Sequence, residues 1–194
     1  MKTVLVVSAT EKSRAFFCDF LRACQYSDIS PAASAEEAGA LMDAREYDLC
    51  IINAPLPDSD GTALALRAVH SGNGQSLIVA AEKLAENMRA AVESAGVFII
   101  TKPVRRDVLW NAVRNMAVVH NRMSAMREQN ETLKQKLEDV KYINRAKSIL
   151  MTGLKMSEPQ AHRFIEKQAM ERRITKGEVA RRVINTYVIS NYEE

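Results

Sequence analysis

The segment "YDLCIINAPLPDSDG", Tyr47 to Gly61, is where this 194-residue chain comes nearest to the residue pattern of a reactive site. A short apolar run ends at Asn53, and a loop with two prolines and two aspartates follows it. A carboxylate at the end of a buried strand could attack a phosphoryl group as a nucleophile. Asn53 carries a neutral amide instead, so the segment has either lost this chemistry or been put to another use.

The elements that must position Asn53 are short apolar runs that alternate with helix-like stretches. These runs are rich in β-branched residues and lack polar alternation, which is typical of parallel strands covered on both faces. The alternation predicts an α/β domain with a five-stranded, doubly wound parallel sheet. The predicted strands are residues 3–7, 48–52, 76–81 and 96–101, with a weaker one at 26–32.

In such sheets, functional residues gather at the carboxyl ends of the strands. Ser8 and Ala9 after the first strand provide no carboxylate for a hard divalent cation. Asp58 and Asp60 lie beyond the prolines, where we interpret them as turn and helix-capping residues. Lys102 is predicted to be structural and to hydrogen-bond the Asn53 amide or strand-end carbonyls. The predicted strand-end residues are Ser8, Ala9, Asn53, Ala81 and Lys102.

The order of these elements, the segment ending at Gly61 and "TKPV" at residues 101–104 resemble the receiver domain of bacterial response regulators. The resemblance covers roughly residues 1–119 and implies a flavodoxin-like fold. It also implies a phosphoryl-transfer pocket built from an acidic pair, an acceptor Asp, a hydroxyl side chain and a Lys.

This chain departs from that pattern at nearly every pocket position. Ser8 and Ala9 replace the acidic pair, and Asn53 replaces the acceptor. Ala81 replaces the hydroxyl residue, and Ile99 stands where a switch aromatic usually lies, which leaves Lys102 as the one match. Because acyl phosphate formation needs a carboxylate and a divalent cation, we interpret the domain as a pseudo-receiver that is not phosphorylated.

Composition excludes several other classes of protein. No apolar run of about 18 residues is present, and the N-terminus becomes charged too early for a signal peptide, so we expect a cytoplasmic protein without a membrane span. Cys18, Cys24 and Cys50 lack CxxC spacing and are predicted to be reduced core thiols. Neither a nucleotide-binding glycine motif nor a metal-binding motif occurs, so we predict no cofactor, no metal and no enzymatic activity.

Charge is distributed unevenly along the chain. Residues 1–119 contain 12 Lys and Arg against 14 Asp and Glu, net −2, whereas residues 120–194 contain 15 against 10, net +5. A basic segment is more often a solvated helical surface than a nucleic-acid site, so it indicates a nucleic-acid partner only when other features agree with it.

From about Val104 the pattern predicts one long helix. Residues 116, 123, 130, 137 and 144 fall at heptad position a, and residues 119, 126, 133, 140 and 147 fall at position d. This seam predicts a coiled-coil linker at residues 120–141 and a homodimer, in which a polar Asn at position a favours one register. The alternative is a linker helix that packs on its own chain. The predicted dimer contacts are Met123, Met126, Asn130, Leu133, Leu137 and Val140.

Residues 142–194 are predicted to form a small three-helix domain. Ser157 with Gln160, and Thr175 with Glu178, have the form of capping boxes that open the second and third helices. Gly153 is predicted to end the first helix in a left-handed conformation. The apolar stripes leave many Lys and Arg residues on the outer face, which favours a phosphate-rich partner.

The segment from Ile143 to Ile184, "INRAKSILMTGLKMSEPQAHRFIEKQAMERRITKGEVARRVI", resembles the ANTAR domain, the RNA-binding module of transcription antitermination regulators. The resemblance implies binding to paired leader-RNA hairpins, which prevents formation of the terminator hairpin. Control by a protein partner or by dimerisation is expected in place of phosphorylation. The predicted RNA-binding residues are Arg145, Lys147, Arg163, Lys167, Arg173 and Lys176.

Two other classes stay open at this point. A DNA-binding regulator would read bases from one helix, for which Arg181, Arg182 and Asn185 are the candidates. A protein scaffold of the two-component type would use the same domains without any nucleic acid.

Overall fold

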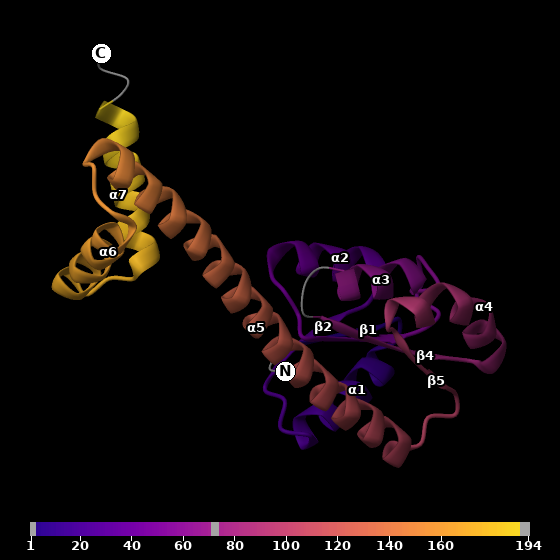
Figure 1. The fold of residues 1–194 in the computed structure, drawn as a ribbon. Coiled ribbons are helices and arrows are strands. Elements are labelled where there is room, and N and C mark those ends of the chain that lie inside the picture. The colour runs from indigo at the N-terminus through magenta and orange to yellow at the C-terminus, as the bar shows by residue number, and fades with distance from the viewer. Residues whose placement is uncertain (1–2, 71–73, 191–194) are drawn as a thin grey trace. The chain divides into compact units, whose positions relative to one another are not determined.

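The computed structural model describes residues 3–70 and 74–190, with side chains to residue 186. Its sheet is fully parallel and has the strand order β2-β1-β3-β4-β5 (Figure 1). The prediction of a five-stranded parallel sheet is therefore confirmed, including the weaker second strand. The strands are β1 Thr3–Ser8, β2 Asp28–Ala32, β3 Leu49–Asn53, β4 Gln75–Ala80 and β5 Phe98–Thr101.

Helices cover both faces of this sheet. Alternate strand residues point to opposite faces, so Leu5 and Val7 join one core layer while Val4 and Val6 join the other. The first layer packs against α2, α3 and α4, and the second against α1 and the beginning of α5 (Figure 1). The helices are α1 Glu11–Ala23, α2 Ala35–Ala44, α3 Thr62–His70, α4 Glu82–Val92 with the 3₁₀ turn η1 Glu93–Ala95, and α5 Arg106–Gly153.

The chain divides into two compact units, residues 1–125 and 126–194, and α5 contributes to both. Met116 is fully buried in the core of the first unit together with Leu109 and Val113. Met116, counted as the first a residue of the heptad seam, therefore packs on its own chain and is not available to a second copy. Buried His120, one turn further along α5, also packs in the first unit through Asp48, whose Oδ1 lies 3.6 Å from His120 Nε2.

In the second unit, the end of α5 packs with α6 Glu158–Arg172 and α7 Lys176–Ser190. Both predicted capping boxes are present: Ser157 N–H donates to Gln160 Oε1 at 2.8 Å, and Thr175 N–H donates to Glu178 Oε2 at 2.9 Å. The core of this unit consists of Ala146, Leu150, Ala161, Ile165, Ala169, Val179, Ala180 and Ile184.

Gly153 does not have the predicted left-handed conformation. It is the last helical residue of α5, and the positive φ of 51° falls at Lys155. The backbone N–H groups of Leu154 and Met156 both donate to the carbonyl of Leu150. These two bonds satisfy an open carbonyl at the helix end, so the chain turns without requiring an unusual conformation at glycine.

Cys18 and Cys50 are buried in the core of the first unit, as predicted. Cys24, predicted to lie there too, is only partly buried. Burial raises the pKa of Cys50 to about 12, so this thiol stays protonated at neutral pH. Among the described helices, none is long and apolar enough to cross a membrane.

Candidate functional site

The carboxyl edge of the sheet brings Ser8 and Asn53 together. The two residues are register partners at the ends of β1 and β3, and Asn53 Nδ2 donates a hydrogen bond of 2.9 Å to Ser8 Oγ. Ser8 is fully buried, so this bond satisfies a hydroxyl that has no access to water. The amide of Asn53 therefore has a structural partner where an Asp would carry a reactive carboxylate.

Lys102, which follows β5, is held against the same edge. Its Nζ donates a hydrogen bond of 2.7 Å to the carbonyl of Ala54, the residue after Asn53. Its backbone N–H donates to the carbonyl of Ala80 at 2.8 Å. Partial burial lowers the pKa of Lys102. The prediction that Lys102 bonds a strand-end carbonyl is confirmed.

A second cation reaches this edge from α1, and the sequence pattern did not reveal it. Arg14 Nη1 donates to the carbonyl of Ser8 at 2.6 Å and to the carbonyl of Ala9 at 3.1 Å. Arg14 lies in the first turn of α1, so the helix start carries its guanidinium back over the end of β1. Its position after "SATEKS" could have suggested this contact only once the helix start was known.

These residues do not fit a divalent cation. Ala9 and Ala81 carry no donor atom, Ser8 Oγ accepts from Asn53, and the carbonyl of Ala54 accepts from Lys102. Two positive side chains already lie at this edge, where a hard cation requires carboxylate oxygens. Within residues 3–70 and 74–190, no group of three His, Cys, Asp or Glu side chains could hold a metal ion.

The loop aspartates cap helices, as predicted. Asp58 accepts hydrogen bonds of 2.9 Å from the backbone N–H groups of Ala35 and Glu36 at the start of α2, and these bonds lower the pKa of Asp58. Asp60 accepts a hydrogen bond of 2.9 Å from the N–H of Thr62, the first residue of α3. Both carboxylates therefore serve the packing of helices on the sheet.

Gly61 explains how the loop closes. Its φ is +89°, and a Cβ at this position would lie 2.8 Å from Ile52 Cγ2 in the buried strand. Any other residue would be strained by this φ and would also press on the core. The segment from Tyr47 to Gly61 therefore contains the residues that shape the turn after β3, although β3 itself ends in the amide of Asn53.

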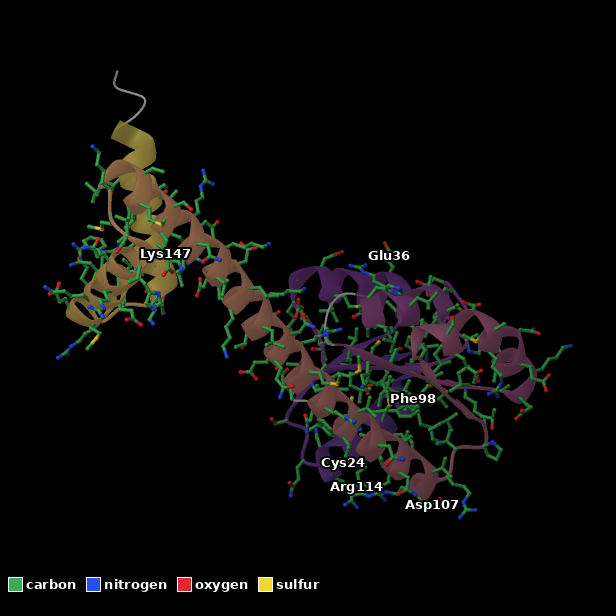
Figure 2. All side chains as sticks on the ribbon, viewed as in Figure 1. Cys24, Glu36, Phe98, Asp107, Arg114 and Lys147 are labelled. Atoms are coloured by element: carbon green, nitrogen blue, oxygen red, sulfur yellow. The ribbon has the colours of Figure 1, made fainter. Side chains whose placement is uncertain are left out.

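The predicted RNA-binding cations of the second unit fall into two groups. Lys147, labelled in Figure 2, pairs with Glu158 at 2.7 Å, and Lys167 lies 3.8 Å from Glu171. Lys176 pairs with Glu166. The other three side chains are exposed and form no hydrogen bond or salt bridge within the described residues. These three are Arg145, Arg163 and Arg173.

Arg181 is held inside the second unit, a contact that the sequence pattern did not reveal. Its Nη2 donates to Asp139 Oδ1 at 2.9 Å, and its guanidinium lies over the ring of Tyr142, 4.7 Å from the ring centre. Gly177 makes room for this arrangement, because a Cβ there would lie 2.3 Å from the Asp139 carboxylate. Arg181 is therefore engaged and poorly placed to read bases, which leaves Arg182 and Asn185 on the exposed side of α7.

The apolar residues of the predicted seam are exposed along the middle of α5. Met123, Met126, Leu133, Leu137 and Val140 are between 49% and 65% exposed, and Asn130 is exposed between them. Lys147, counted as the last d residue, pairs with Glu158 of its own chain. The exposed apolar seam, residues 123–140 at their a and d positions, thus belongs to a stretch of α5 whose apolar side chains join neither core.

Comparison with known proteins agrees with this geometry. Residues 4–114, more than half of the chain, match the response regulator receiver domain family, and residues 131–184 match the ANTAR domain. The transcriptional regulatory protein PdtaR of Mycobacterium tuberculosis is 26% identical over 185 residues, which cover 95% of this chain and 90% of the relative.

Solved receiver domains share the fold of the first unit. A receiver domain protein from Methanospirillum hungatei JF-1 gives a TM-score of 0.56 at 21% identity, covering 63% of this chain and 98% of the other. The signal receiver domain of an HD domain-containing protein from Pseudomonas fluorescens Pf-5 also gives 0.56 at 21% identity, covering 64% and 92%. The chain therefore belongs to the response regulator receiver family, and its second unit carries an ANTAR domain.

Proposed function

We propose that this protein is an RNA-binding transcription antitermination regulator that binds hairpins in the leader of a messenger RNA. The observation that carries the proposal is the outer face of the ANTAR domain, where exposed Arg145, Arg163 and Arg173 lack carboxylate partners within the described residues. Arginines that are free of internal ion pairs can neutralise phosphates without first breaking a salt bridge. Bound leader hairpins would then be unable to join the terminator.

Three further cations belong to the same proposed surface but are already paired with carboxylates in the free protein. Lys147, Lys167 and Lys176 each face a glutamate of their own domain. Binding of RNA through these residues requires exchange of a carboxylate for a phosphate, so their net contribution is smaller than that of the free arginines. We assign Arg145, Arg163 and Arg173 the main phosphate contacts and the three lysines supporting ones.

The exposed apolar seam on α5 supports a homodimer. Five apolar side chains at heptad spacing lie in water in the single chain, and a second copy would cover them. A dimer carries two ANTAR domains, so it can hold two hairpins of one leader. The second hairpin then binds at the high effective concentration set by the first, which raises affinity without any new contact.

The receiver domain, in this proposal, receives its signal through protein contact and not through phosphorylation. Asn53 replaces the nucleophile, and Arg14 and Lys102 bring positive side chains to the edge where a divalent cation would be needed. Retention of the complete fold without the pocket chemistry favours a docking role, in which a partner protein releases or sequesters the dimer. The activity is regulatory, with no covalent step.

Purified full-length protein and a leader RNA with two tandem hairpins provide the test. We expect Arg163→Glu to weaken binding of the leader RNA strongly, because it replaces a phosphate contact with a repulsive charge. Lys83→Glu, an equal charge reversal on α4 of the receiver domain, should leave binding unchanged. Equal binding by wild type and Arg163→Glu would refute the proposed surface.

Competition with duplex DNA separates the proposal from a DNA-binding function. An excess of duplex DNA from the promoter upstream of that leader should displace little of the bound RNA. Equal or tighter binding of the duplex would show a DNA-binding regulator. Complete lack of nucleic-acid binding would favour a protein scaffold.

A further inference from the structure

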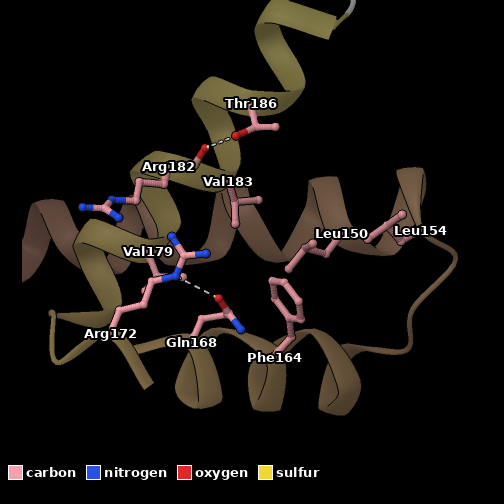
Figure 3. Close-up of a pocket in the computed structure, with 9 residues that line it drawn as sticks. All are labelled: Leu150, Leu154, Phe164, Gln168, Arg172, Val179, Arg182, Val183 and Thr186. Atoms are coloured by element: carbon pink, nitrogen blue, oxygen red, sulfur yellow. Dashed lines mark hydrogen bonds between the residues drawn. The ribbon is translucent and has the colours of Figure 1, made fainter. Parts of the chain in front are cut away.

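A cavity of about 250 Å³ lies between the end of α5, α6 and α7 of the ANTAR domain (Figure 3). Its base is apolar, and its rim carries an amide, a hydroxyl and two guanidinium groups. None of the proposed phosphate-binding residues lines it, so the cavity is distinct from that surface. The lining residues are Leu150, Leu154, Phe164, Gln168, Arg172, Val179, Arg182, Val183 and Thr186.

The half-buried ring of Phe164 stands in this cavity beside Leu150 (Figure 3). An aromatic ring that is neither fully packed nor free in water offers a surface on which a flat ligand can stack. Aromatic rings bind unstacked nucleic-acid bases in this way, with little dependence on sequence. The aliphatic walls from Val179 and Val183 would exclude water from the other edges of such a ligand.

Gln168 is held in a fixed orientation next to that ring. Its Oε1 accepts from Arg172 Nε at 3.1 Å, and its Nε2 donates to Glu171 Oε2 at 2.9 Å. A carboxamide has two acceptor sites and two donor hydrogens, so one acceptor and one donor remain available. This is the pair that a glutamine uses to bind the edge of a base.

The rim is positively charged. The Arg172 guanidinium lies beside Gln168, and Arg182 extends outward from α7 (Figure 3). Within the part of the chain with described side chains, the Arg182 guanidinium forms no hydrogen bond or salt bridge. Arg172 therefore lies within the cavity wall, while Arg182 is placed to meet a phosphate outside it.

The size of the cavity limits what it can hold. Sites for drug-sized ligands usually span about 300–1,000 Å³, and this cavity lies just below that range. It is large enough for one flat heterocycle and too small for a complete dinucleotide. The combination of ring, oriented amide and outer guanidinium matches a single nucleotide whose sugar and phosphate stay outside.

We propose that this cavity binds one unstacked base of the RNA hairpin loop, with the base on Phe164 and its edge hydrogen-bonded to Gln168. Arg182 binds the adjoining phosphate. This inference rests on the proposed RNA-binding function and adds the site at which loop sequence is read. Arg145, Arg163 and Arg173 hold the backbone in any sequence, whereas the cavity discriminates between bases.

The test uses full-length protein and a pool of tandem RNA hairpins with a constant stem and randomised loops. The tightest-binding loop is selected, and each of its bases is then removed in turn to leave an abasic position. We expect one abasic position to weaken binding to wild type about tenfold, the range observed for loss of one stacked base. The same RNA change should weaken binding to Gln168→Leu and Phe164→Leu only slightly, because the base has already lost its site.

Arg163→Gln serves as the matched control, because Arg163 lies on α6 outside the cavity. It should weaken binding of intact and abasic RNAs by the same factor. Helical circular dichroism and melting of each variant establish that the ANTAR domain is folded, and Gln168→Met provides a milder substitution at the same position.

The outcomes separate the two proposals. If the wild type binds hairpins but no loop position is coupled to Gln168 or Phe164, the cavity is not a base site and the proposed function stands. If the wild type binds no hairpin of the pool, both proposals are overturned. Coupling of one loop base to both cavity residues, with none to Arg163, is the result expected.

Discussion

Replacement of Leu133 and Leu137 by Ala should dissociate the proposed homodimer. Both side chains are about three-fifths exposed in the single chain, at 59% and 65%. Full burial of a Leu side chain stabilises by about 1.5–3 kcal/mol, so each exposed portion offers about 1–2 kcal/mol to a partner. One dimer contains four of these leucines, so the double substitution should weaken the free energy of dimerisation by about 4 kcal/mol or more.

This loss corresponds to an increase of about a thousand-fold in the dissociation constant of the dimer, since each 1.4 kcal/mol changes Kd by about tenfold. Sedimentation velocity across a concentration series measures the monomer–dimer equilibrium directly. We expect wild type to sediment as a dimer at concentrations where the Leu133→Ala/Leu137→Ala variant sediments as a monomer. The melting of the receiver domain should be unchanged, because neither side chain belongs to its core.

Two valines provide a matched control. Val140 lies at position d of the exposed apolar seam and Val118 lies off it, yet they are similarly exposed, at 54% and 62%. Val140→Ala should weaken the dimer, whereas Val118→Ala should not. Equal effects of the two substitutions, or a dimer unaffected by loss of both leucines, would refute the coiled-coil reasoning.

Three further predictions concern the two domains separately. Incubation with a small phosphodonor and Mg²⁺ should give no base-labile phosphoprotein, either for wild type or for Asn53→Asp, which lacks a carboxylate pair to hold the metal; phosphate incorporation measured by mass spectrometry would contradict this. The lowered pKa of Asp58 means that its stabilising effect is present above its unfolded pKa of about 3.9 and fades as pH falls through the lower folded value. Urea titrations should therefore find Asp58→Asn less stable than wild type at neutral pH, with the difference shrinking in acid. Gly177→Ala should displace the Asp139 carboxylate and lower the stability of the ANTAR domain by about 1–3 kcal/mol, and an unchanged thermal melt would refute this reading.

The fold follows from signals that are local in the sequence. Apolar runs and capping residues predicted the strands and helix starts, because strand burial and N-cap hydrogen bonds depend on residues within a few positions of one another. The contact between Ser8 and Asn53 is also accessible from sequence once the order of strands is assumed. The rule that strand ends meet at one edge brings these two residues together.

Contacts between distant side chains could not be predicted in this way. Arg181 and Asp139 are far apart in sequence, and no periodicity distinguishes this arginine from its exposed neighbour Arg182. Lys147 was predicted to bind RNA, and nothing in the sequence pattern indicated that the turn after α5 brings Glu158 against it. Met116 fits the heptad pattern because periodicity reports an apolar face without identifying which surface covers it.

The cavity in the ANTAR domain illustrates a further limit. Apolar periodicity places Phe164 on the inward face of its helix and gives Gln168 no role. Their ring and amide become a candidate base site only through the space that α5, α6 and α7 leave between them. The volume of this cavity depends on how the three helices pack. Hydrophobic periodicity indicates only which residues are buried or exposed, not the space left between helices.

Readthrough in a purified transcription reaction tests the central claim most directly. The template encodes a leader with two tandem hairpins that overlap a terminator, and the protein is added without any phosphodonor. The proposed function predicts that wild type raises the fraction of full-length transcript and that Arg145→Glu/Arg163→Glu does not. Termination that is unaffected by wild type, or readthrough that appears only after addition of a phosphodonor, would contradict it.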